Sequence, residues 1–240
     1  MKKLFLNQKS ALTNEAVQKF IGDVKIHRNK LNILPSFIYL KDYIDAGFIT
    51  GSQDIAYKNT INQSGEVTSD QLKSIGIKFV MIGHSERREN QKETKNILRA
   101  KFDQAISNNF DIVYCIGESL VDYKLKETYK KIISQLNDIF ENNDLSKIQN
   151  KIYIAYEPVW AIGSGFTPTN AEIECVAKSI KNYFTEKEIN IEILYGGSVN
   201  ANNILELNNI DSIDGFLVGG ASNSSEKTIP MIENLMNSTK

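Results

Sequence analysis

The sequence predicts a closed (β/α)8 TIM barrel in the α/β class, with residues 1–240 forming a single domain. Short apolar segments alternate with longer amphipathic segments along the whole chain, giving eight strand–helix units. Several short segments are apolar almost throughout, as expected for parallel strands covered on both faces. An open, doubly wound sheet is the alternative, because alternation alone does not show closure. Against it, no GxGxxG motif follows the first apolar segment.

The elements are expected as follows. The strand segments are, in order, KLFL, NIL, GFIT, KFVMI, DIVYCI, KIYIAY, IEILY and DGFLV. Between them, apolar residues recur at the i, i+3, i+4, i+7 spacing of helices that pack by one face. Three such stripes are Val17, Phe20, Ile21 and Val24; Ile132, Leu136, Ile139 and Phe140; and Ile173, Val176, Ala177 and Ile180. Thr169 and Glu172 have capping-box spacing, which predicts a helix start there.

Composition narrows the class of protein. With 41% hydrophobic residues the chain can bury a large core, and a net charge of −1 argues against nucleic acid as a partner. No segment approaches the roughly 20 apolar residues of a membrane span. Cys115 and Cys175 have apolar neighbours and no CxxC spacing, so we expect two buried, free thiols in a reducing compartment. The chain is therefore expected to be soluble and cytoplasmic.

Glu157 ends the sixth expected strand, and the loop PVWAIGSGFTPT follows it directly. Ligands bind at the carboxyl ends of the strands in barrels of this kind, so this carboxylate is expected to face a ligand. Pro158 restricts the backbone after the acid, whereas Gly163 and Gly165 give it freedom further on. A rigidly held base followed by a loop that opens and closes is the expected arrangement. Taken alone, a Glu-Pro pair is more simply a surface turn.

Two glycine pairs follow the last two expected strands, Gly196–Gly197 before Ser198 and Gly219–Gly220. Glycines at such positions let backbone N–H groups approach an anion, and the loops after the seventh and eighth strands often bind phosphate. One pair alone is more simply a tight turn. Two pairs in successive loops favour a phosphate site.

His84, Lys9 and Asn7 also follow expected strands. His84 precedes a helix for which Ser85 is the expected N-cap, and the positive end of that helix disfavours a protonated imidazole. A neutral imidazole can donate a hydrogen bond to a carbonyl group. Lys9 can neutralise phosphate or developing enolate charge, and Asn7 can orient Lys9 or bind substrate. With Glu157 as base, these residues suit proton removal beside the carbonyl of a small phosphorylated sugar, and no step requires a metal or a cofactor.

Five segments resemble the triosephosphate isomerase family. They are IGHSERR at 82–88, CIGES at 115–119, YEPVWAIGSG at 156–165, YGGSV at 195–199 and DGFLVGGAS at 214–222. The resemblance covers essentially the whole chain and is weakest from about residue 28 to 64. It implies interconversion of dihydroxyacetone phosphate and D-glyceraldehyde 3-phosphate through an enediol(ate), in glycolysis and gluconeogenesis, by a homodimer.

The resemblance also implies residue roles. Glu157 would move the proton between the two carbons, His84 would polarise the carbonyl, and Lys9 would stabilise charge with Asn7 beside it. Glu86 corresponds to a buried acid that orders Lys9 and His84. Ile162 and Leu217 correspond to an apolar pair that closes over Glu157. The backbone N–H groups that would hold the phosphate belong to Gly163, Ser198, Gly219 and Gly220.

The chain departs from the family pattern in several places. Gln8 and Ser10 replace an aromatic residue and a methionine beside Lys9, and Phe166 replaces a lysine at the end of the lid. Near the expected dimer contact, Asp54 replaces an asparagine and Ser64 a threonine. Two other functions stay open, namely another phosphosugar-acting barrel enzyme and a phosphosugar-binding protein without turnover. Because Glu157, His84 and Lys9 are all present, the isomerase is the function we expect.

Overall fold

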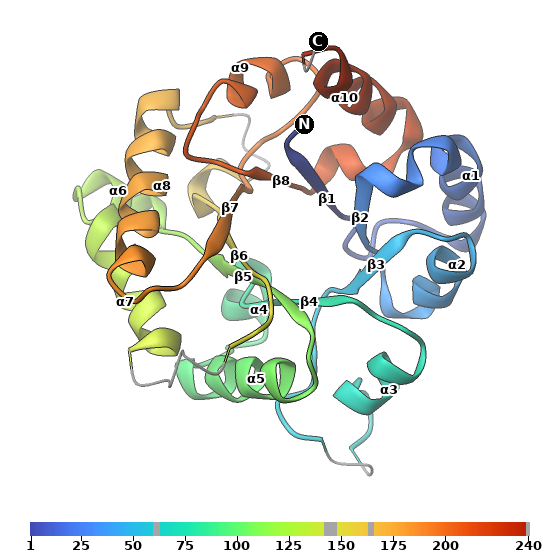
Figure 1. Ribbon diagram of the computed structural model, residues 1–240, viewed down its shortest axis with the longest axis horizontal. Coiled ribbons are helices and arrows are strands. Elements are labelled where there is room, and N and C mark those ends of the chain that lie inside the picture. Colours follow the sequence, from blue (N-terminus) through green and yellow to red (C-terminus); the bar gives the residue numbers. More distant parts are fainter. Residues whose placement is uncertain (60–62, 142–147, 163–165, 239–240) are drawn as a thin grey trace.

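The computed structural model describes residues 1–59, 63–141, 148–162 and 166–238. Eight parallel strands form one closed barrel in the order β1-β2-β3-β4-β5-β6-β7-β8, with helices arranged around it (Figure 1). The strands are β1 Lys3–Asn7, β2 Leu31–Leu34, β3 Ile49–Ser52, β4 Phe79–Ile82, β5 Asp111–Ile116, β6 Ile152–Tyr156, β7 Ile191–Tyr195 and β8 Gly215–Val218.

The first strand closes the barrel. Leu4 of β1 pairs with Leu31 of β2 on one side and with Phe216 of β8 on the other. Every strand therefore has two neighbours, and no sheet edge is left for another chain to extend. The predicted closed barrel is confirmed, and the open doubly wound sheet is excluded.

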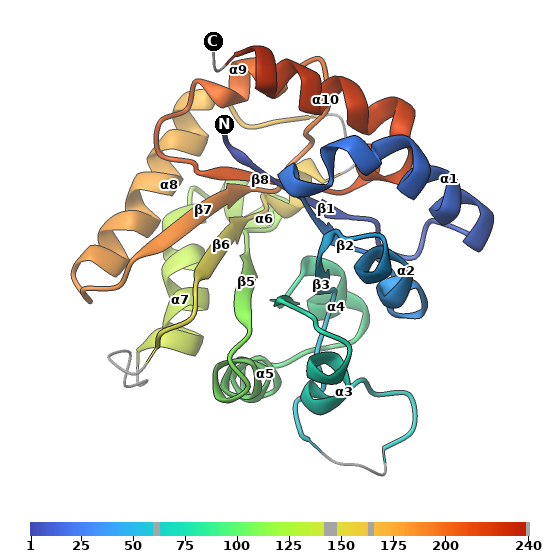
Figure 2. The ribbon, with the colours of Figure 1, turned by 45° about the vertical axis from the view of Figure 1, so that its right-hand side comes forward.

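The helices lie outside the strands, as Figures 1 and 2 show from two directions. They are α1 Asn14–Val24, α2 Leu40–Asp45, α3 Ser69–Ser74, α4 Ser85–Asn90, α5 Lys95–Ser107, α6 Leu120–Lys124, α7 Thr128–Phe140, α8 Asn170–Thr185, α9 Ile204–Asn208 and α10 Ser225–Asn237. Short 3-10 helices are η1 Lys25–Lys30, η2 Phe37–Tyr39, η4 Val159–Ala161 and η5 Gly220–Asn223. The three predicted stripes face the barrel and are buried, except that Val176 is only half-buried. Thr169 caps α8 through the predicted capping box with Glu172.

The core has two layers. Alternate strand residues point outward and pack under the helices, as Leu4 and Leu6 do. The others fill the barrel interior, where the ring of Phe5 lies 5.2 Å from that of Phe79 and 4.9 Å from that of Tyr153. Because both faces of each strand are buried, the strand sequences are apolar nearly throughout.

The third strand begins later than the sequence segment GFIT predicts. It runs from Ile49 to Ser52. Gly47 has a left-handed backbone conformation with φ of 82°, so it belongs to the turn before the strand, and Phe48 connects that turn to Ile49. Gly51 belongs to the strand although it is not apolar. A Cβ at this position would lie about 2.5 Å from ring atoms of Phe79, so the packing of the barrel interior requires glycine.

The two cysteines differ in environment. Cys115 is buried in β5 as expected, but Cys175 is exposed on α8, and both are free. The prediction that both are buried was wrong for Cys175, because it lies on the solvent side of the stripe formed by Ile173 and Ala177. Among the described helices, none has the length and apolar character needed to cross a membrane.

Candidate active site

A cavity of about 500 Å³ lies at the carboxyl ends of the strands. Asn7, Lys9, His84, Glu157, Ile162, Ser198, Leu217, Gly219 and Gly220 all line it, as do Gly196 and Gly197. Gly163, the remaining expected phosphate ligand, lies outside the described residues. The closed barrel thus brings residues from loops far apart in the sequence to one mouth.

Glu157 follows β6 and is held tightly from both sides. Its backbone N–H donates to the carbonyl oxygen of Ile116 at 2.8 Å. A Cβ at Gly117 would overlap the carbonyl oxygen of Glu157, and one at Gly196 would lie 2.7 Å from its Cγ. The residue is only 4% exposed, and its Oε2 atom has no hydrogen-bond partner among the described residues. A carboxylate so buried and with a vacant oxygen is available to accept a proton.

His84 is itself the N-cap of α4, so the prediction that Ser85 is the cap was wrong. The imidazole Nδ1 accepts the backbone N–H of Glu86 at 3.3 Å, and Ser85 is the first residue of the helix. Because Nδ1 accepts, the ring proton lies on Nε2. Nε2 faces the cavity and lies 3.4 Å from Oε1 of Glu157. The helix cap therefore fixes which imidazole nitrogen can donate to a ligand.

Lys9 adopts a left-handed backbone conformation with φ of 52°, which is uncommon for a residue with a side chain. Two side chains hold it there. Asn7 Oδ1 accepts the Lys9 N–H at 3.1 Å, and Gln53 Nε2 donates to the Lys9 carbonyl oxygen at 2.8 Å. Such a conformation costs roughly 1–3 kcal/mol and persists only when surrounding contacts hold it. The hydrogen bonds from Asn7 and Gln53 do so here.

Glu86 pairs with Lys9, as the family resemblance implies, and its Oε2 lies 3.9 Å from His84 Nδ1. The expectation that Glu86 is buried was wrong, because half of its side chain is exposed. Glu86 does not line the main cavity but a smaller hollow of about 290 Å³ beside it, which Gln53, Asp54 and Arg87 also line.

The loops after β7 and β8 form one end of the cavity wall. Ser198 Oγ donates to the carbonyl oxygen of Ala161 at 2.7 Å, and Asn203 Nδ2 donates to the carbonyl oxygen of Ser198 at 2.8 Å. Ser222 Oγ bonds to the carbonyl oxygens of both Gly219 and Asn7, at 2.6 and 3.0 Å. The loops after β1 and β8 are therefore linked directly.

Lys227 also lines this end of the cavity, and the sequence prediction missed it. It belongs to the first turn of α10, whose start at Ser225 follows the second glycine pair closely. Counting onward from Gly219–Gly220 to the next helix would have found this cation. Its position adds positive charge at the end of the cavity where a phosphate is expected.

Glu118 anchors the segment that follows Glu157. Its Oε1 atom accepts hydrogen bonds from Trp160 Nε1 at 2.9 Å and from the Tyr156 hydroxyl at 3.2 Å. The Trp160 ring stacks on Tyr123, with ring centres 4.3 Å apart. Burial raises the pKa of the Glu118 carboxyl group, while the bonds from Trp160 and Tyr156 oppose this. Ile162, the last described residue before the glycines, is thus held next to the cavity, whereas Phe166 beyond them is 73% exposed.

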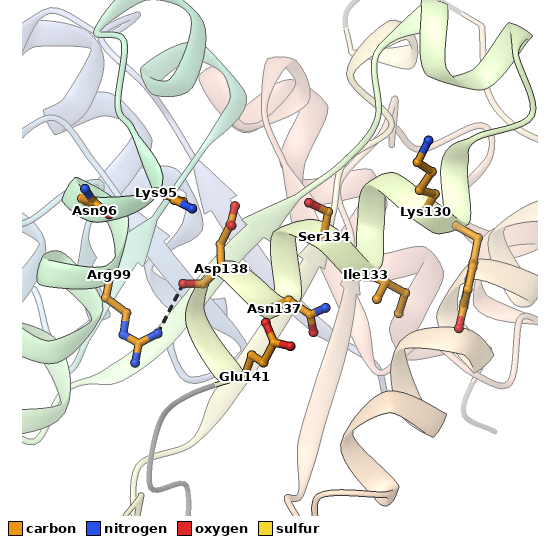
Figure 3. Close-up of a pocket in the computed structure, with 10 residues that line it drawn as sticks. Lys95, Asn96, Arg99, Lys130, Ile133, Ser134, Asn137, Asp138 and Glu141 are labelled. Carbon is orange, nitrogen blue, oxygen red and sulfur yellow. Dashed lines mark hydrogen bonds between the residues drawn. The ribbon is translucent and has the colours of Figure 1, made fainter.

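A different hollow, of about 870 Å³, lies outside the barrel between α5 and α7 (Figure 3). None of the expected site residues lines it. Its charges are mixed, because Lys95, Arg99 and Lys130 occur beside Asp138 and Glu141 (Figure 3). The predicted chemistry therefore belongs to the cavity at the strand ends.

Comparison with known proteins agrees with this geometry. The family model described as triosephosphate isomerase matches residues 3–235. A triosephosphate isomerase of Mesomycoplasma hyopneumoniae is 40% identical over 235 residues, covering 92% of this chain and 93% of the relative. One of Buchnera aphidicola is 44% identical over 193 residues, covering 78% and 74%. One of Thermoanaerobacter pseudethanolicus is 36% identical over 215 residues, covering 86% of each chain.

Proposed function

The chain belongs to the triosephosphate isomerase family, and we propose how its residues divide the work of that reaction. The protein is an isomerase that interconverts dihydroxyacetone phosphate and D-glyceraldehyde 3-phosphate, a step of glycolysis. The reaction moves one proton between neighbouring carbons through an enediol(ate). Nothing in the comparisons supports the two alternatives, another phosphosugar-acting enzyme or a binding protein without turnover.

Glu157 is the base in this proposal. Its carboxylate removes the proton from the carbon beside the carbonyl group, and the electrons of the broken C–H bond form the C=C bond of the enediolate. Return of the proton to the neighbouring carbon gives the isomeric product. The observation that supports this most is a buried carboxylate whose Oε1 lies 3.4 Å from Nε2 of His84 and whose Oε2 has no hydrogen-bond partner among the described residues.

His84 is the proposed hydrogen-bond donor to the substrate carbonyl. Its Nδ1 is occupied by the backbone N–H of Glu86, so Nε2–H is the group available to a ligand. A donor aimed at the oxygen on which negative charge develops stabilises the transition state more than the ground state. Proton transfer between the two substrate oxygens can use the same nitrogen.

Lys9 supplies positive charge beside that oxygen, with Asn7 holding its backbone and Glu86 its ammonium group. Main-chain N–H groups of Ser198, Gly219 and Gly220, and of Gly163, hold the phosphate, and Lys227 adds a cation there. The glycine pairs and the lining of the cavity support this assignment. Ile162 and Leu217 provide apolar cover over Glu157, and exclusion of water strengthens the electrostatic contacts inside.

The activity is tested by mixing the purified protein with D-glyceraldehyde 3-phosphate, NADH and a dehydrogenase that reduces dihydroxyacetone phosphate. Oxidation of NADH above the rate without the protein is the expected result. A folded protein that gives no such rate rules out the proposed reaction. Substitution of an unphosphorylated triose is the matched control and should give a far lower rate, since the phosphate contacts contribute binding energy to the transition state.

We also propose that the protein works as a homodimer. The described residues before α3, from residue 63 on, lie outside the barrel in both views (Figures 1 and 2), and Ser64 among them is exposed. The hollow of about 290 Å³ beside Lys9 and Glu86 is open to receive such a segment from a second copy. Light scattering during size exclusion should give about twice the 27.1 kDa mass of one chain. A single-chain mass at concentrations where the enzyme is active would contradict this.

Two further expectations remain proposals, a single domain over residues 1–240 and a location in the cytoplasm. The closed barrel to which β1 and β8 both contribute supports the first. Membership of a glycolytic enzyme family supports the second. A protease-resistant core that lacks either end of the chain would contradict the single domain, and activity confined to a membrane or secreted fraction would contradict the location.

A further inference from the structure

A second cavity lies at the opposite end of the barrel, where the strands begin. Its volume is about 380 Å³. Aromatic side chains of the barrel interior, Phe5, Phe79 and Tyr153, lie at its base and are almost fully buried. We call it the amino-terminal cavity, defined by these residues and by the lysines described next. The proposed isomerase mechanism uses none of its residues.

Positive charge is concentrated around this cavity. Five lysines and a single acid, Asp111, line it, whereas the whole chain has a net charge of −1. The lysines are Lys2, Lys3, Lys30, Lys78 and Lys151. Like charges gathered around one opening repel each other, so an anion that binds there is attracted by several groups at once.

Only part of this charge is compensated within the described part of the chain. Lys3 Nζ forms a salt bridge with Glu192 at 2.5 Å, and Lys2 donates to the carbonyl oxygen of Ile210. Lys78 and Lys151 form no salt bridge with any described residue. The contact of Lys30 Nζ is with the sulfur of Met236 at 2.9 Å, which carries no charge. Three ammonium groups therefore remain available to a ligand.

The barrel fixes where two of these lysines begin. Lys78 precedes β4 and accepts a hydrogen bond from the backbone N–H of Asp111, while Lys151 precedes β6 and accepts one from Ile112. They consequently flank β5 on its two sides. Asp111 Oδ1 accepts the backbone N–H of Lys151 at 2.9 Å, which holds the one acid of the lining beside the start of β6.

We propose that the amino-terminal cavity binds a small oligophosphate anion, by its chain of phosphate groups. Ammonium groups bind phosphate oxygens through charge-assisted hydrogen bonds, and several of them around one opening match several phosphates. The lysines surround a hollow and not a flat or convex face, so a compact anion fits better than a nucleic-acid strand. The hollow in Figure 3 differs in that Asp138 and Glu141 occur beside its three cations, so its lining has less excess positive charge.

The site is tested by titration calorimetry with tripolyphosphate and with ATP, at about 0.15 M ionic strength. The catalytic cavity is first saturated with 2-phosphoglycolate, a small phosphorylated carboxylate. One mole of tripolyphosphate should bind per mole of chain. Equal affinity for ATP means that the phosphate chain alone is recognised, and tighter binding of ATP means that its base contacts the cavity as well; both outcomes support the site.

The lysines are tested by the double variant Lys78→Glu, Lys151→Glu, with Lys73→Glu, Lys124→Glu as matched control. Lys73 and Lys124 are exposed on α3 and α6 and line neither of the two cavities. The cavity variant should bind tripolyphosphate at least about tenfold more weakly, because two charge-assisted contacts are lost. The control variant should bind as the unmodified chain does. Both double variants should keep the kcat and KM of the unmodified chain, because neither pair of lysines lines the cavity of Glu157.

Three results would overturn the proposal. The first is that no binding is detected up to about 1 mM tripolyphosphate, the upper end of a useful affinity for a small anion. The second is that 2-phosphoglycolate abolishes the binding, and the third is that both double variants weaken it equally. If charge reversal prevents folding, Lys78→Gln, Lys151→Gln removes the charges without adding acids and is subject to the same criteria. A single-stranded oligonucleotide that binds more tightly than tripolyphosphate, and equally to both double variants, would likewise exclude this cavity.

Discussion

Nε2 of His84 and Oε1 of Glu157 lie 3.4 Å apart at the mouth of the barrel, and both residues are more than 95% buried. They come from the loops after β4 and β6, which have no strand contact with each other. The hydrogen bond from the Glu157 N–H to β5 fixes the carboxylate, and the cap of α4 fixes the imidazole, so the two groups are positioned independently. An acid and an imidazole so placed can act on the two ends of one carbonyl-containing fragment.

Replacement of His84 by Gln should lower kcat by about 10²–10³, the typical cost of removing one preorganised donor to a developing oxyanion. The amide can still donate a hydrogen bond but cannot move protons between the two oxygens. Steady-state kinetics in both directions measure the effect. The matched control is His27→Gln, since His27 lies in η1 outside the cavity. If both variants keep the wild-type kcat, His84 is not the donor.

Asp54 belongs to a cluster of two acids and two cations, of which Arg87 is one third exposed and the other three are buried. Its carboxylate pairs with Lys101 at 2.6 Å and with Arg87 at 2.8 Å, and both cations also pair with Glu93. Asp54→Asn would leave two cations with one acid, while burial, which raises the pKa of the Asp54 carboxyl group, offsets part of the pairing; we expect a loss of about 1–3 kcal/mol in the free energy of unfolding. Urea denaturation measures it.

The control for that substitution is Asp45→Asn, which breaks the exposed pair with Lys41. A surface pair is worth at most about 1 kcal/mol, so little change is expected. The family resemblance implies an asparagine where Asp54 stands, and in this chain the aspartate pairs with Lys101 and Arg87. Equal stability of the Asp54→Asn variant and the unmodified chain would show that the ion pairs of Asp54 do not stabilise the fold.

Glu118 should make stability depend on pH. Burial raises the pKa of its carboxyl group above the ordinary 4.5, so the folded state holds the proton more tightly than the unfolded chain does. This contribution favours the fold below pH 4.5 and is lost as pH rises through the folded-state pKa. Glu118→Gln, which has no charge to desolvate, should therefore gain stability relative to the unmodified chain between about pH 4 and 7. Urea denaturation of the variant and the unmodified chain across that pH range measures the difference in their stability. A difference that shrinks as pH rises would contradict the prediction.

The two thiols should differ in reactivity. Cys175 is exposed, whereas burial, and then the nearby Glu157, raise the pKa of the Cys115 thiol well above its ordinary value. The thiolate is the reactive species, so a thiol reagent should label one cysteine per native chain and two in denaturant. Cys175→Ser should abolish the native labelling. Rapid labelling of Cys115 in the native protein would contradict its burial.

The sequence was most informative where one residue pattern had one physical consequence. Apolar strand segments predicted the barrel because both faces of its strands are buried, and Glu157 could be placed because it ends such a segment. The burial of Glu86 and Cys175 was predicted incorrectly. Both lie on helices, where a rotation of one position separates the core from solvent. Lys227 was missed because the prediction at the second glycine pair stopped at the loop and did not extend to the first turn of the following helix.

The central proposal, that Glu157 is the base, is tested most directly by the kcat of Glu157→Gln. This substitution keeps the shape of the side chain and removes the proton acceptor. A fall in kcat of at least about 10²–10⁴ is expected, as is typical when a general base is lost. Glu15→Gln, at an exposed position of α1, should keep the wild-type kcat. A folded Glu157→Gln enzyme whose kcat stays within about twofold of wild type, far short of that loss, would contradict the assignment.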